Sequence, residues 1–405
     1  VHILVPKLIA TIGFDAIDKM CRERNCQARG SSGEHSAVVD RIDVSNWRRI
    51  GFPEYDLVGD MINCANFLAE EEDKLPDVAA AAPAGEERLF GKQPGVDPDF
   101  DLIMNEQLAK NEYPKEKLDA ARAADHTSLA AQFATQEIWD QYKDSVSTGK
   151  AKWTMARAIN SGVSYPSSFV GCHAGDRESY DDFKDFFYPV IEAYHKGFSM
   201  SAGSELAGTP SERMDPAKIP FKLSDTAKSK IISTRIRVAR NLAMFPLNPG
   251  GTKESREAIA AMMAKVYDGI AEDSPLKGSF FLHTTMSDEQ RQALIDGHQL
   301  FRGKDAMQAA SGYHEHWPHG RGVFHNPDKS FVNWVNEGDH VRIISMQAGG
   351  DVEAVFARLS AGAKAIEDGI REQTKAEAVF MMHPKFGSVT CCPSNIGTGM
   401  RGSVH

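Results

Sequence analysis

The stretch WVNEGDHVRIISM, residues 334–346, consists of two apolar runs separated by a short polar segment. Apolar runs that flank Asn, Gly and Asp in this way are typical of two strands joined by a tight turn, so the stretch predicts a hairpin. Gly338 is the expected turn residue between the two runs. Glu337 and Asp339 flank it, and these two carboxylates are either solvated turn residues or groups with a chemical role.

A further strand is predicted from IISTRIRVARN, residues 231–241. Its apolar residues alternate with polar ones, which places Arg235 and Arg237 on one face and leaves the other face to pack against a core. Residues 252–270 and 351–370 instead show the apolar spacing of amphipathic helices. Strands and helices mixed in this order predict an α+β fold.

The composition divides the chain into four parts. Residues 1–75 have the pattern of a compact folded piece, whereas residues 76–101 are rich in Ala, Pro and Gly without a sustained period, which is typical of a linker. Residues 102–205 are predicted to form a small, mostly helical domain, with a helix broken near Pro189. Residues 206–405 are predicted to form a larger domain.

The bulk composition argues against several classes of protein. The chain has 405 residues and a formal net charge of −10, so a general affinity for nucleic acid is not expected. No apolar run reaches the roughly 18 residues that a membrane span needs, and we expect neither a membrane segment nor a secretory leader. The six cysteines form no CxxC pairs, which favours reduced thiols and a cytoplasmic location. Because the first residue is Val, we expect a fragment or a processed piece.

Glycine-rich phosphate loops, protein-kinase motifs and zinc-ligand spacings are all absent from the sequence. A phosphate site would therefore have to use side chains. Guanidinium groups suit this role because they bind phosphate oxygens in a bidentate manner and stay charged. The arginines that qualify are Arg29, Arg235, Arg237, Arg342 and Arg401. Taken one at a time, each is also compatible with a surface salt bridge.

Two further groups could carry chemistry. In TCCPSNIGTG, residues 390–399, small hydroxyl and amide groups follow Cys391 and Cys392. Backbone N–H groups pointed at a thiolate there would lower its pKa. The alternative is a pair of buried structural cysteines. Glu34 in RGSSGEHS, residues 29–36, is either a solvated turn residue or a functional carboxylate.

Together these segments resemble the phosphagen (guanidino) kinases, the family of arginine, creatine and taurocyamine kinases. CPSNIGTGMRGSVH (392–405) resembles the family signature almost letter for letter, and residues 170–198 resemble the family's small domain. Further similar stretches are STRIRVARN, WPHGRGVFHN, WVNEGDHVRIISMQ, QARGSSGEHS and DVSNWRR. The likeness covers nearly the whole chain except the linker. It implies a small all-helical domain and a larger domain with an antiparallel sheet flanked by helices, similar to glutamine synthetase.

The order of the segments differs from the family pattern. In the family, the part that resembles residues 1–75 follows the SVH that ends this chain, and here it comes first. Val-His stands at both ends of the chain, which is either a coincidence or one strand position seen twice. The resemblance favours a piece of a tandem array, with a circular permutant as the alternative. A complete site then uses either residues 1–75 of the same chain, continuing the strand that stops at His405, or the equivalent segment of a neighbouring unit.

The resemblance implies reversible transfer of the γ-phosphoryl group of MgATP to a guanidino substrate, with ATP or ADP and Mg²⁺ as cofactors and no dedicated metal site. The implied nucleotide-binding residues are Ser233, Arg235, Arg237, His325, Arg342, Arg401 and Arg29. The implied catalytic residues are Glu34, Glu337, Cys392 and Arg401. The implied substrate loop, residues 161–173, includes Ser168, Val170, Gly171 and His173. Its compact length resembles that of arginine and taurocyamine kinases, which implies an arginine-like substrate.

One position departs from the family. The family pattern is Asn-Glu-Glu-Asp-His, and the second Glu is the expected substrate contact and base, but Gly338 stands there in this chain. A general base contributes about 10²- to 10⁴-fold to a rate. We therefore expect impaired catalysis with retained nucleotide binding. The alternative is a kinase-derived structural or binding module, with neighbouring units or a large assembly as partners and a cytoskeletal or ciliary association left open.

Overall fold

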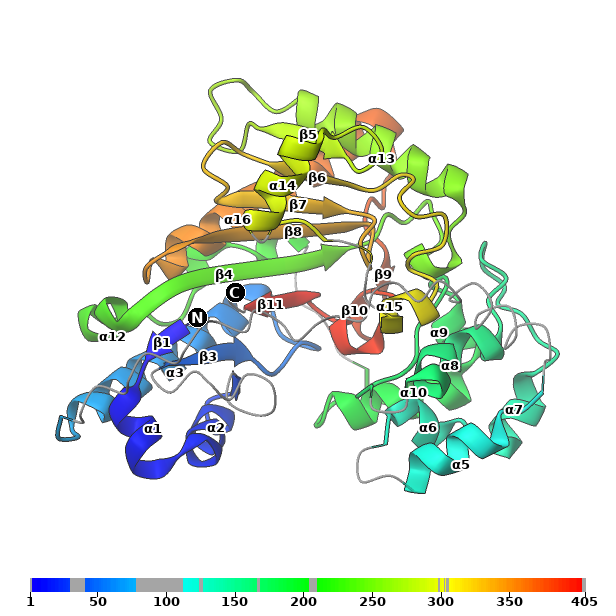
Figure 1. Cartoon of the computed structure of the whole chain (residues 1–405), viewed down its shortest axis with the longest axis horizontal. Coiled ribbons are helices and arrows are strands. Elements are labelled where there is room, and N and C mark those ends of the chain that lie inside the picture. Colours follow the sequence, from blue (N-terminus) through cyan, green and yellow to red (C-terminus); the bar gives the residue numbers. More distant parts are fainter. Residues whose placement is uncertain are drawn as a thin grey trace.

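The computed structural model describes residues 2–29, 41–77, 112–123, 127–165, 168–203, 210–297, 299–301, 303 and 306–402. Its central feature is an antiparallel sheet with the strand order β2-β3-β1-β4-β8-β7-β6-β5, in which β11 also pairs with β4. These strands are β1 (His2–Leu4), β2 (Cys26–Arg29), β3 (Arg41–Asn46), β4 (Ile231–Arg240), β5 (Ser279–Leu282), β6 (Gly322–His325), β7 (Phe331–Val335), β8 (Val341–Ala348) and β11 (Met400–Gly402). Figure 1 shows this sheet beside a separate cluster of helices, which confirms the predicted α+β fold.

The predicted hairpin is present. β7 pairs with β8 from Phe331↔Ser345 to Val335↔Val341, and residues 336–340 form the connection. β8 then pairs along the whole length of β4. The alternation seen in the sequence places Ile236 and Val238 of β4 in the main core, which leaves the arginines of that strand to the opposite face.

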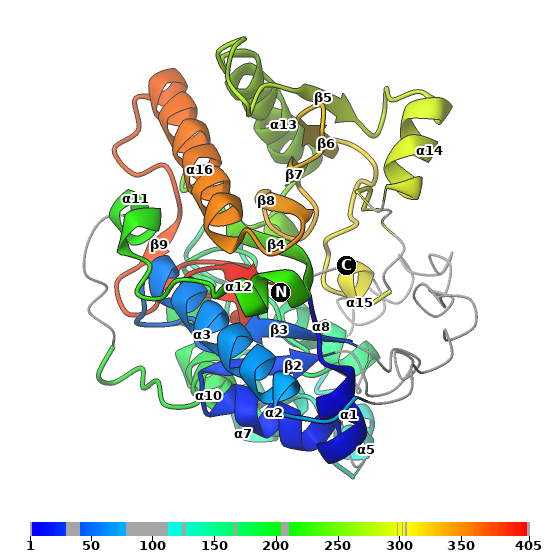
Figure 2. The same ribbon diagram turned by 90° about the vertical axis from the view of Figure 1, so that its left-hand side faces the viewer.

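Long helices cover the core face of the sheet. Figure 2 shows α16 and α3 on one side of the sheet and α14 and α15 on the other. The predicted helix at 351–370 is α16 (Val352–Thr374), capped by the Asp351 side chain. The predicted helix at 252–270 is α13 (Lys253–Asp268), with a capping box formed by Thr252 and Ser255. The helices of this part are α1 (Pro6–Ile12), α2 (Phe14–Arg22), α3 (Glu54–Asp73), α11 (Pro210–Arg213), α12 (Asp225–Lys230), α13, α14 (Asp288–Asp296), α15 (Ala306–Ala310) and α16.

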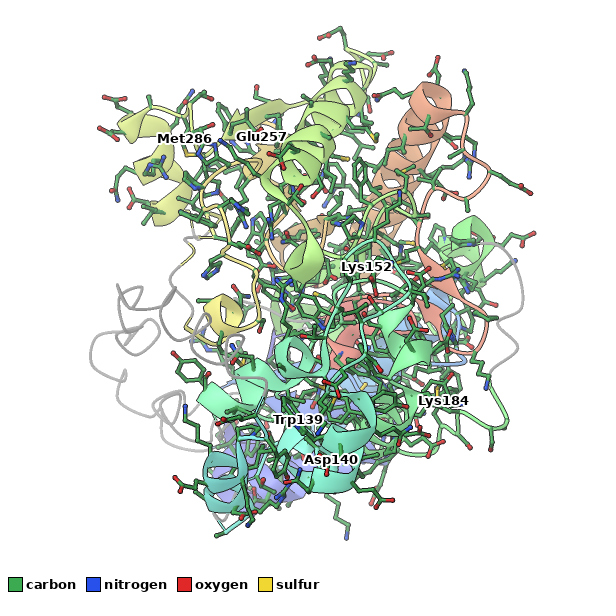
Figure 3. All side chains as sticks on the ribbon, turned by 90° about the vertical axis from the view of Figure 1, so that its right-hand side faces the viewer. Trp139, Asp140, Lys152, Lys184, Glu257 and Met286 are labelled. Carbon is green, nitrogen blue, oxygen red and sulfur yellow. The ribbon has the colours of Figure 1, made fainter. Side chains whose placement is uncertain are left out.

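The smaller part is helical, as expected. Its elements are α5 (Lys115–Ala123), α6 (Leu129–Phe133), α7 (Gln136–Tyr142), α8 (Met155–Ser164), α9 (Ser179–Asp182) and α10 (Lys184–Tyr194). Figure 3 shows Trp139, Asp140 and Lys184 within it, and Glu257 and Met286 at the distant end of the molecule. The expected break near Pro189 is wrong, because α10 continues through that residue. Phe186, Phe187, Val190 and Ile191 are fully buried around it, and their packing holds the helix together despite the missing backbone N–H.

The first segment of the chain folds back onto the same sheet. β11 occupies one stretch of the free edge of β4, with Gly402 opposite Ile236, and β1 occupies the next, with His2 opposite Ser233. β1 and β11 accordingly lie near each other beside β4 in Figure 1. His405 and nearly all of the predicted linker, residues 78–101, lie outside the described residues.

Buried polar contacts join this first segment to the rest. The Asn46 side chain donates to the Met400 carbonyl at 3.3 Å and accepts the Gly402 N–H at 3.0 Å. Glu54 at the start of α3 is fully buried and contacts Arg240 of β4 at 3.0 Å, with Arg213 at 3.7 Å. Burial raises the pKa of Glu54 although both arginines oppose this shift, so part of the attraction offsets desolvation.

Two short strands complete the secondary structure, β9 (Met382–His383) and β10 (Gly387–Ser388). They pair with each other in a small separate sheet, which precedes the turn that carries Cys391 and Cys392. None of the helices in the described ranges combines the length and the apolar character that a membrane span needs.

Replacing Glu54 tests how strongly the first segment is attached. Glu54→Gln leaves the buried Arg240 and Arg213 without a counter-charge, so we expect a loss of about 3–5 kcal/mol in the free energy of unfolding. Asp368→Asn is the matched control, because its pair with Lys364 is half exposed and should contribute about 1 kcal/mol or less. Denaturant unfolding measures both. Equal, small losses would show that the buried cluster does not hold the segment in place.

Candidate active site

The sequence-predicted nucleotide residues share one face of the sheet. Arg401 lies directly opposite Arg237, and Arg342 lies opposite Ala239, two positions along β4. Residues opposite each other or two apart along a strand point to the same side. Strand pairing carries this face from β8 across β7 to β6. On the other side of β4, it carries the face across β1 and β3 to β2. It carries Ser233, Arg235, Arg237, Arg342, Arg401, His325 and Arg29.

The arginines on this face are buried or half-buried, and Glu337 and Asp43 offset only part of their charge. Arg235 is 5% exposed. Among the described residues, no side chain or carbonyl accepts a hydrogen bond from the guanidinium of Arg235, Arg237 or Arg401. Burial lowers the pKa of Arg237, and the nearby Arg342, Arg235 and Arg401 lower it further. For the same reasons the pKa of Arg401 falls to about 9, with Arg29 and Arg49 as the neighbouring charges. Clustered cations of this kind favour binding of a multiply charged anion.

The Glu337 carboxylate forms an ion pair within this arginine cluster. Its Oε2 lies 2.9 Å from Arg342 Nη1, and its Oε1 accepts a hydrogen bond from Gln308 Nε2 at 2.9 Å. The N–H of Gly338 also donates to Oε2 at 2.6 Å. Burial raises the pKa of Glu337, but these partners outweigh burial and hold the pKa below its ordinary value. The carboxylate is therefore charged at neutral pH and already fully engaged.

The other members of the turn hold its shape. Asp339 Oδ1 accepts hydrogen bonds from Asn241 Nδ2 at 2.7 Å and from the Cys391 N–H at 3.1 Å. Asn336 donates to two backbone carbonyls and has the positive φ of the turn, 55°. Gly338 has no positive φ. Gly338 lies in the turn, as expected, and Asn336 is the residue with the positive φ there.

The two cysteines have different surroundings. Cys391 is buried, and its Sγ lies 3.1 Å from the Gly338 carbonyl oxygen and 2.8 Å from the Tyr313 hydroxyl. Cys392 is half-buried, with its Sγ 3.1 Å from Ser394 Oγ. Burial raises the pKa of the Cys392 thiol, and Ser394 and Arg49 only partly oppose this shift. Of the two interpretations of this turn, burial therefore fits the Cys392 thiol and a lowered pKa does not.

The predicted substrate loop is firmly attached on its C-terminal side. The Gly171 carbonyl accepts the Gly162 N–H at 2.8 Å, and Gly171 has a φ of 72° at this close approach. The Val170 carbonyl accepts the Ala130 N–H at 2.9 Å, and Ser168 N–H donates to Tyr165.

His173 is the last residue of this loop, and its side chain is buried. Its N–H donates to Ala158, and its Nδ1 lies 3.0 Å from Ser161 Oγ. Burial lowers the pKa of His173 to about 3, so the ring is neutral. His173 is packed edge-on against Tyr313, with ring centroids 5.2 Å apart. It thus supports the loop from beneath.

The structure adds residues that the sequence did not single out. Trp334 lies opposite Arg342 in the hairpin, and its ring is 5.6 Å from the Arg342 guanidinium and 5.8 Å from that of Arg235. The alternation of β7 was a signal for this placement, because Trp334 precedes the turn by two residues. Tyr313 and Gln308 gave no such signal. Glu34 lies outside the described residues. Within the described ranges, no three His, Cys, Asp or Glu side chains are placed to hold a metal ion.

The Glu337–Arg342 pair predicts a pH dependence. A carboxyl whose folded-state pKa is depressed stabilises the protein above its unfolded pKa, near 4.5, and loses that contribution as the pH falls through the folded value. The free energy of unfolding of the wild type should therefore exceed that of Glu337→Gln by roughly 3–5 kcal/mol at pH 7. This difference in free energy should shrink below pH 4.5. Denaturant unfolding from pH 3 to 7 measures this, with exposed Glu377→Gln as the control. A difference that does not change with pH would contradict the assignment.

Known protein families match three separate ranges of the chain. The family described as ATP:guanido phosphotransferase, C-terminal catalytic domain, matches residues 1–75 and 258–405. The corresponding N-terminal domain matches residues 124–192. The catalytic-domain match is thus split, with one part at each end of the chain.

Several individual relatives are similar to the chain over most or all of its length. An arginine kinase of Anthopleura japonica is 33% identical over 409 residues, which cover all of this chain and 50% of that protein. The chain therefore spans about half the length of this relative. An arginine kinase of Stichopus japonicus is 38% identical over 299 residues, covering 74% of this chain and 77% of that protein. The duplicated taurocyamine kinase of Schistosoma mansoni, solved with bound transition state analog components, is 31% identical with a TM-score of 0.61, covering 99% of this chain and 50% of its own. The chain belongs to the ATP:guanido phosphotransferase family.

Proposed function

We propose that the protein transfers the γ-phosphoryl group of MgATP, reversibly, to a nitrogen of a small arginine-like guanidino substrate, at a rate limited by Gly338. The observation that carries this proposal is the set of buried and half-buried arginines on one sheet face, of which Arg235, Arg237 and Arg401 have no hydrogen-bond acceptor among the described residues. Phosphoryl transfer spreads negative charge over the oxygens of the migrating group. Fixed cations in a water-poor site stabilise such charge more than the same cations would in water.

The nucleotide fits the donor set of this face. Arg29, Arg235, Arg237, Arg342 and Arg401 would bind the phosphate oxygens, and Ser233 and His325 would add contacts at the same surface. Mg²⁺ would be held through the phosphates and water, as is usual for this ion. Arg342 is the most firmly placed of the five, because Glu337 fixes its guanidinium.

The substrate must lose a proton, and a guanidinium group has a pKa above about 12. Glu337 is poorly suited to accept that proton, because Arg342, Gln308 and the Gly338 N–H already occupy its oxygens. Cys392 is half-buried and close to Ser394, and it would orient the guanidinium. With no carboxylate at position 338, we expect positioning and charge stabilisation to remain and proton transfer to be slow.

We also propose that residues 1–75 complete the catalytic domain, with residues 76–101 as a linker, 102–205 as the helical domain and 206–405 as the remainder of the catalytic domain. The pairing of β1 with β4 and the contribution of Arg29 to the arginine face support this assignment. The duplicated relative supports an arrangement with neighbouring units, whose equivalent segment would take the same place.

The second candidate function is a structural or binding module derived from such a kinase. Gly338 is the observation that favours it. In this case the arginine face would still bind nucleotide, and turnover would be absent.

Nucleotide binding tests the arginine face directly. Arg237→Ala should weaken MgADP binding about 10- to 150-fold, since a hydrogen bond to a charged group is worth about 1.5–3 kcal/mol. Arg29→Ala should also weaken binding if residues 1–75 complete the site. Arg371→Ala is the control, because Arg371 lies on α16 and pairs with Glu367. Calorimetry measures all three, and unchanged affinity in Arg237→Ala would refute the proposed nucleotide site.

Turnover separates the two candidate functions. With MgADP and phosphoarginine or phosphotaurocyamine in a coupled assay, we expect a rate about 10²- to 10⁴-fold below that of arginine kinases that have the second Glu. A rate equal to theirs would show that Gly338 causes no impairment. Tight MgADP binding with no turnover on either phosphagen would favour the binding module.

A further inference from the structure

We infer that Tyr313 is a positioning residue that fills the space facing Gly338, so that residues 313 and 338 together determine whether a carboxylate can stand at the substrate side of the turn. This inference rests on the proposed function for its catalytic meaning, but its geometric basis is independent of activity. Neither the sequence motifs nor the family resemblance drew attention to Tyr313.

The backbone at Gly338 does not require glycine, because it has no positive φ. What a side chain would meet there is Tyr313. A Cβ built on Gly338 would come 3.1 Å from Tyr313 Cε2 and 3.6 Å from Arg342 Nη2. A contact of 3.1 Å is tighter than ordinary van der Waals contact, so the tyrosine ring would have to shift. A glutamate side chain also has to pass beyond its Cβ, in a space bounded by that ring and by Arg342.

Several contacts prevent Tyr313 from moving aside. Its hydroxyl lies 2.8 Å from Cys391 Sγ, and its ring packs edge-on against His173. The backbone is held as well: its N–H donates to the Gln308 carbonyl at 3.1 Å, and its carbonyl accepts from the Arg321 guanidinium. Arg321 is fully buried. The side chain is therefore fixed at its base, along one edge and at its tip.

These contacts connect three parts of the proposed site. Cys391 Sγ lies 3.1 Å from the Gly338 carbonyl, so a donor series from the Tyr313 hydroxyl through the Cys391 thiol to that carbonyl holds the turn in place. His173 ends the predicted substrate loop, and Gln308 binds both the Tyr313 backbone and the Glu337 carboxylate. Tyr313 thus supports the substrate loop, the cysteine turn and the carboxylate turn at once.

The consequence is that Gly338 and Tyr313 form a matched small–large pair. Restoring glutamate at position 338 alone would force it against a fixed ring, which costs stability and misplaces the carboxylate. Reducing the side chain at position 313 at the same time would open the space that the glutamate needs. The effects of the two substitutions on the unfolding midpoint and on kcat should therefore be strongly non-additive, as expected for residues in direct contact.

The test is a double-mutant cycle on the full chain, with wild type, Gly338→Glu, Tyr313→Ser and the double variant. Tyr313→Phe combined with Gly338→Glu is the matched control, because it keeps the ring and removes only the hydroxyl. Each protein is assayed for its unfolding midpoint, and for kcat and KM with MgADP and phosphoarginine. The kinetic data show where the effect lies, since a base that acts in the transition state changes kcat more than KM.

We expect Gly338→Glu to lower the unfolding midpoint more in the wild-type background than in the Tyr313→Ser background. We also expect the glutamate to raise kcat about 10²- to 10⁴-fold in the Tyr313→Ser background, which is the usual range for a general base. That increase should be at least tenfold larger than the increase that the glutamate causes in the wild-type background. The Phe control should match Gly338→Glu alone in kcat because the ring remains, and its unfolding midpoint should be no higher because the hydroxyl contact with Cys391 is lost.

Additive midpoints in the cycle would overturn the inference, as would a Phe control that matches the Ser double variant. If no variant turns over phosphoarginine, the proposed activity fails, and the unfolding midpoints still decide whether Tyr313 and Gly338 are coupled.

Discussion

Strand β4 places charged groups and core residues on opposite faces of one backbone, and the rest of the structure depends on this constraint. Ile236 and Val238 anchor it in the main core, and this anchoring points Arg235 and Arg237 to the other side. Guanidinium groups that lower each other's pKa would separate if their supports were mobile. They stay together because the strands that carry them are paired in one sheet. The site is therefore an electrostatic arrangement that the hydrophobic core holds in place.

The carboxylate turn shows how the same constraint limits the chemistry. Glu337 neutralises part of the arginine cluster through its ion pair with Arg342, and the nearby Asp43 acts in the same sense on Arg235 and Arg401. A group in this position stabilises the folded site and cannot easily serve as a proton acceptor as well. In the Asn-Glu-Glu-Asp-His pattern, the two roles are divided between neighbouring residues. With Gly338, one residue is left for both, and the structure assigns it to the ion pair.

Much of this arrangement was predictable from local patterns. The alternation of β4, the hairpin around residue 338 and the helices α13 and α16 follow from the spacing of apolar residues, which is a local property of the sequence. The shared face of the arginines followed in part, because Arg235 and Arg237 lie on one strand. Its extension to Arg401 and Arg29 required the strand pairing, which joins residues far apart along the chain.

The features that the sequence patterns missed depend on burial and on contacts between residues far apart along the chain. The uninterrupted helix at Pro189 depends on packing of its neighbours, and the raised pKa of Cys392 depends on burial, which a motif does not reveal. Gly338 lies in the turn, but the sequence did not reveal that Asn336 is the residue with the positive φ there. Tyr313 lies in a stretch without a recognisable period, and its importance comes entirely from its contacts with distant residues.

The meeting of β1 and β11 along one edge of β4 has a consequence for how such proteins can change over evolution. The hydrogen bonds that β4 offers are satisfied by whichever strand ends lie beside it, and they are indifferent to which of those ends comes first in the polypeptide. Pairing at this edge therefore places no constraint on whether β1 precedes or follows β11 along the chain. Relatives that differ in this order can share one sheet, and selection on strand pairing alone would not distinguish them.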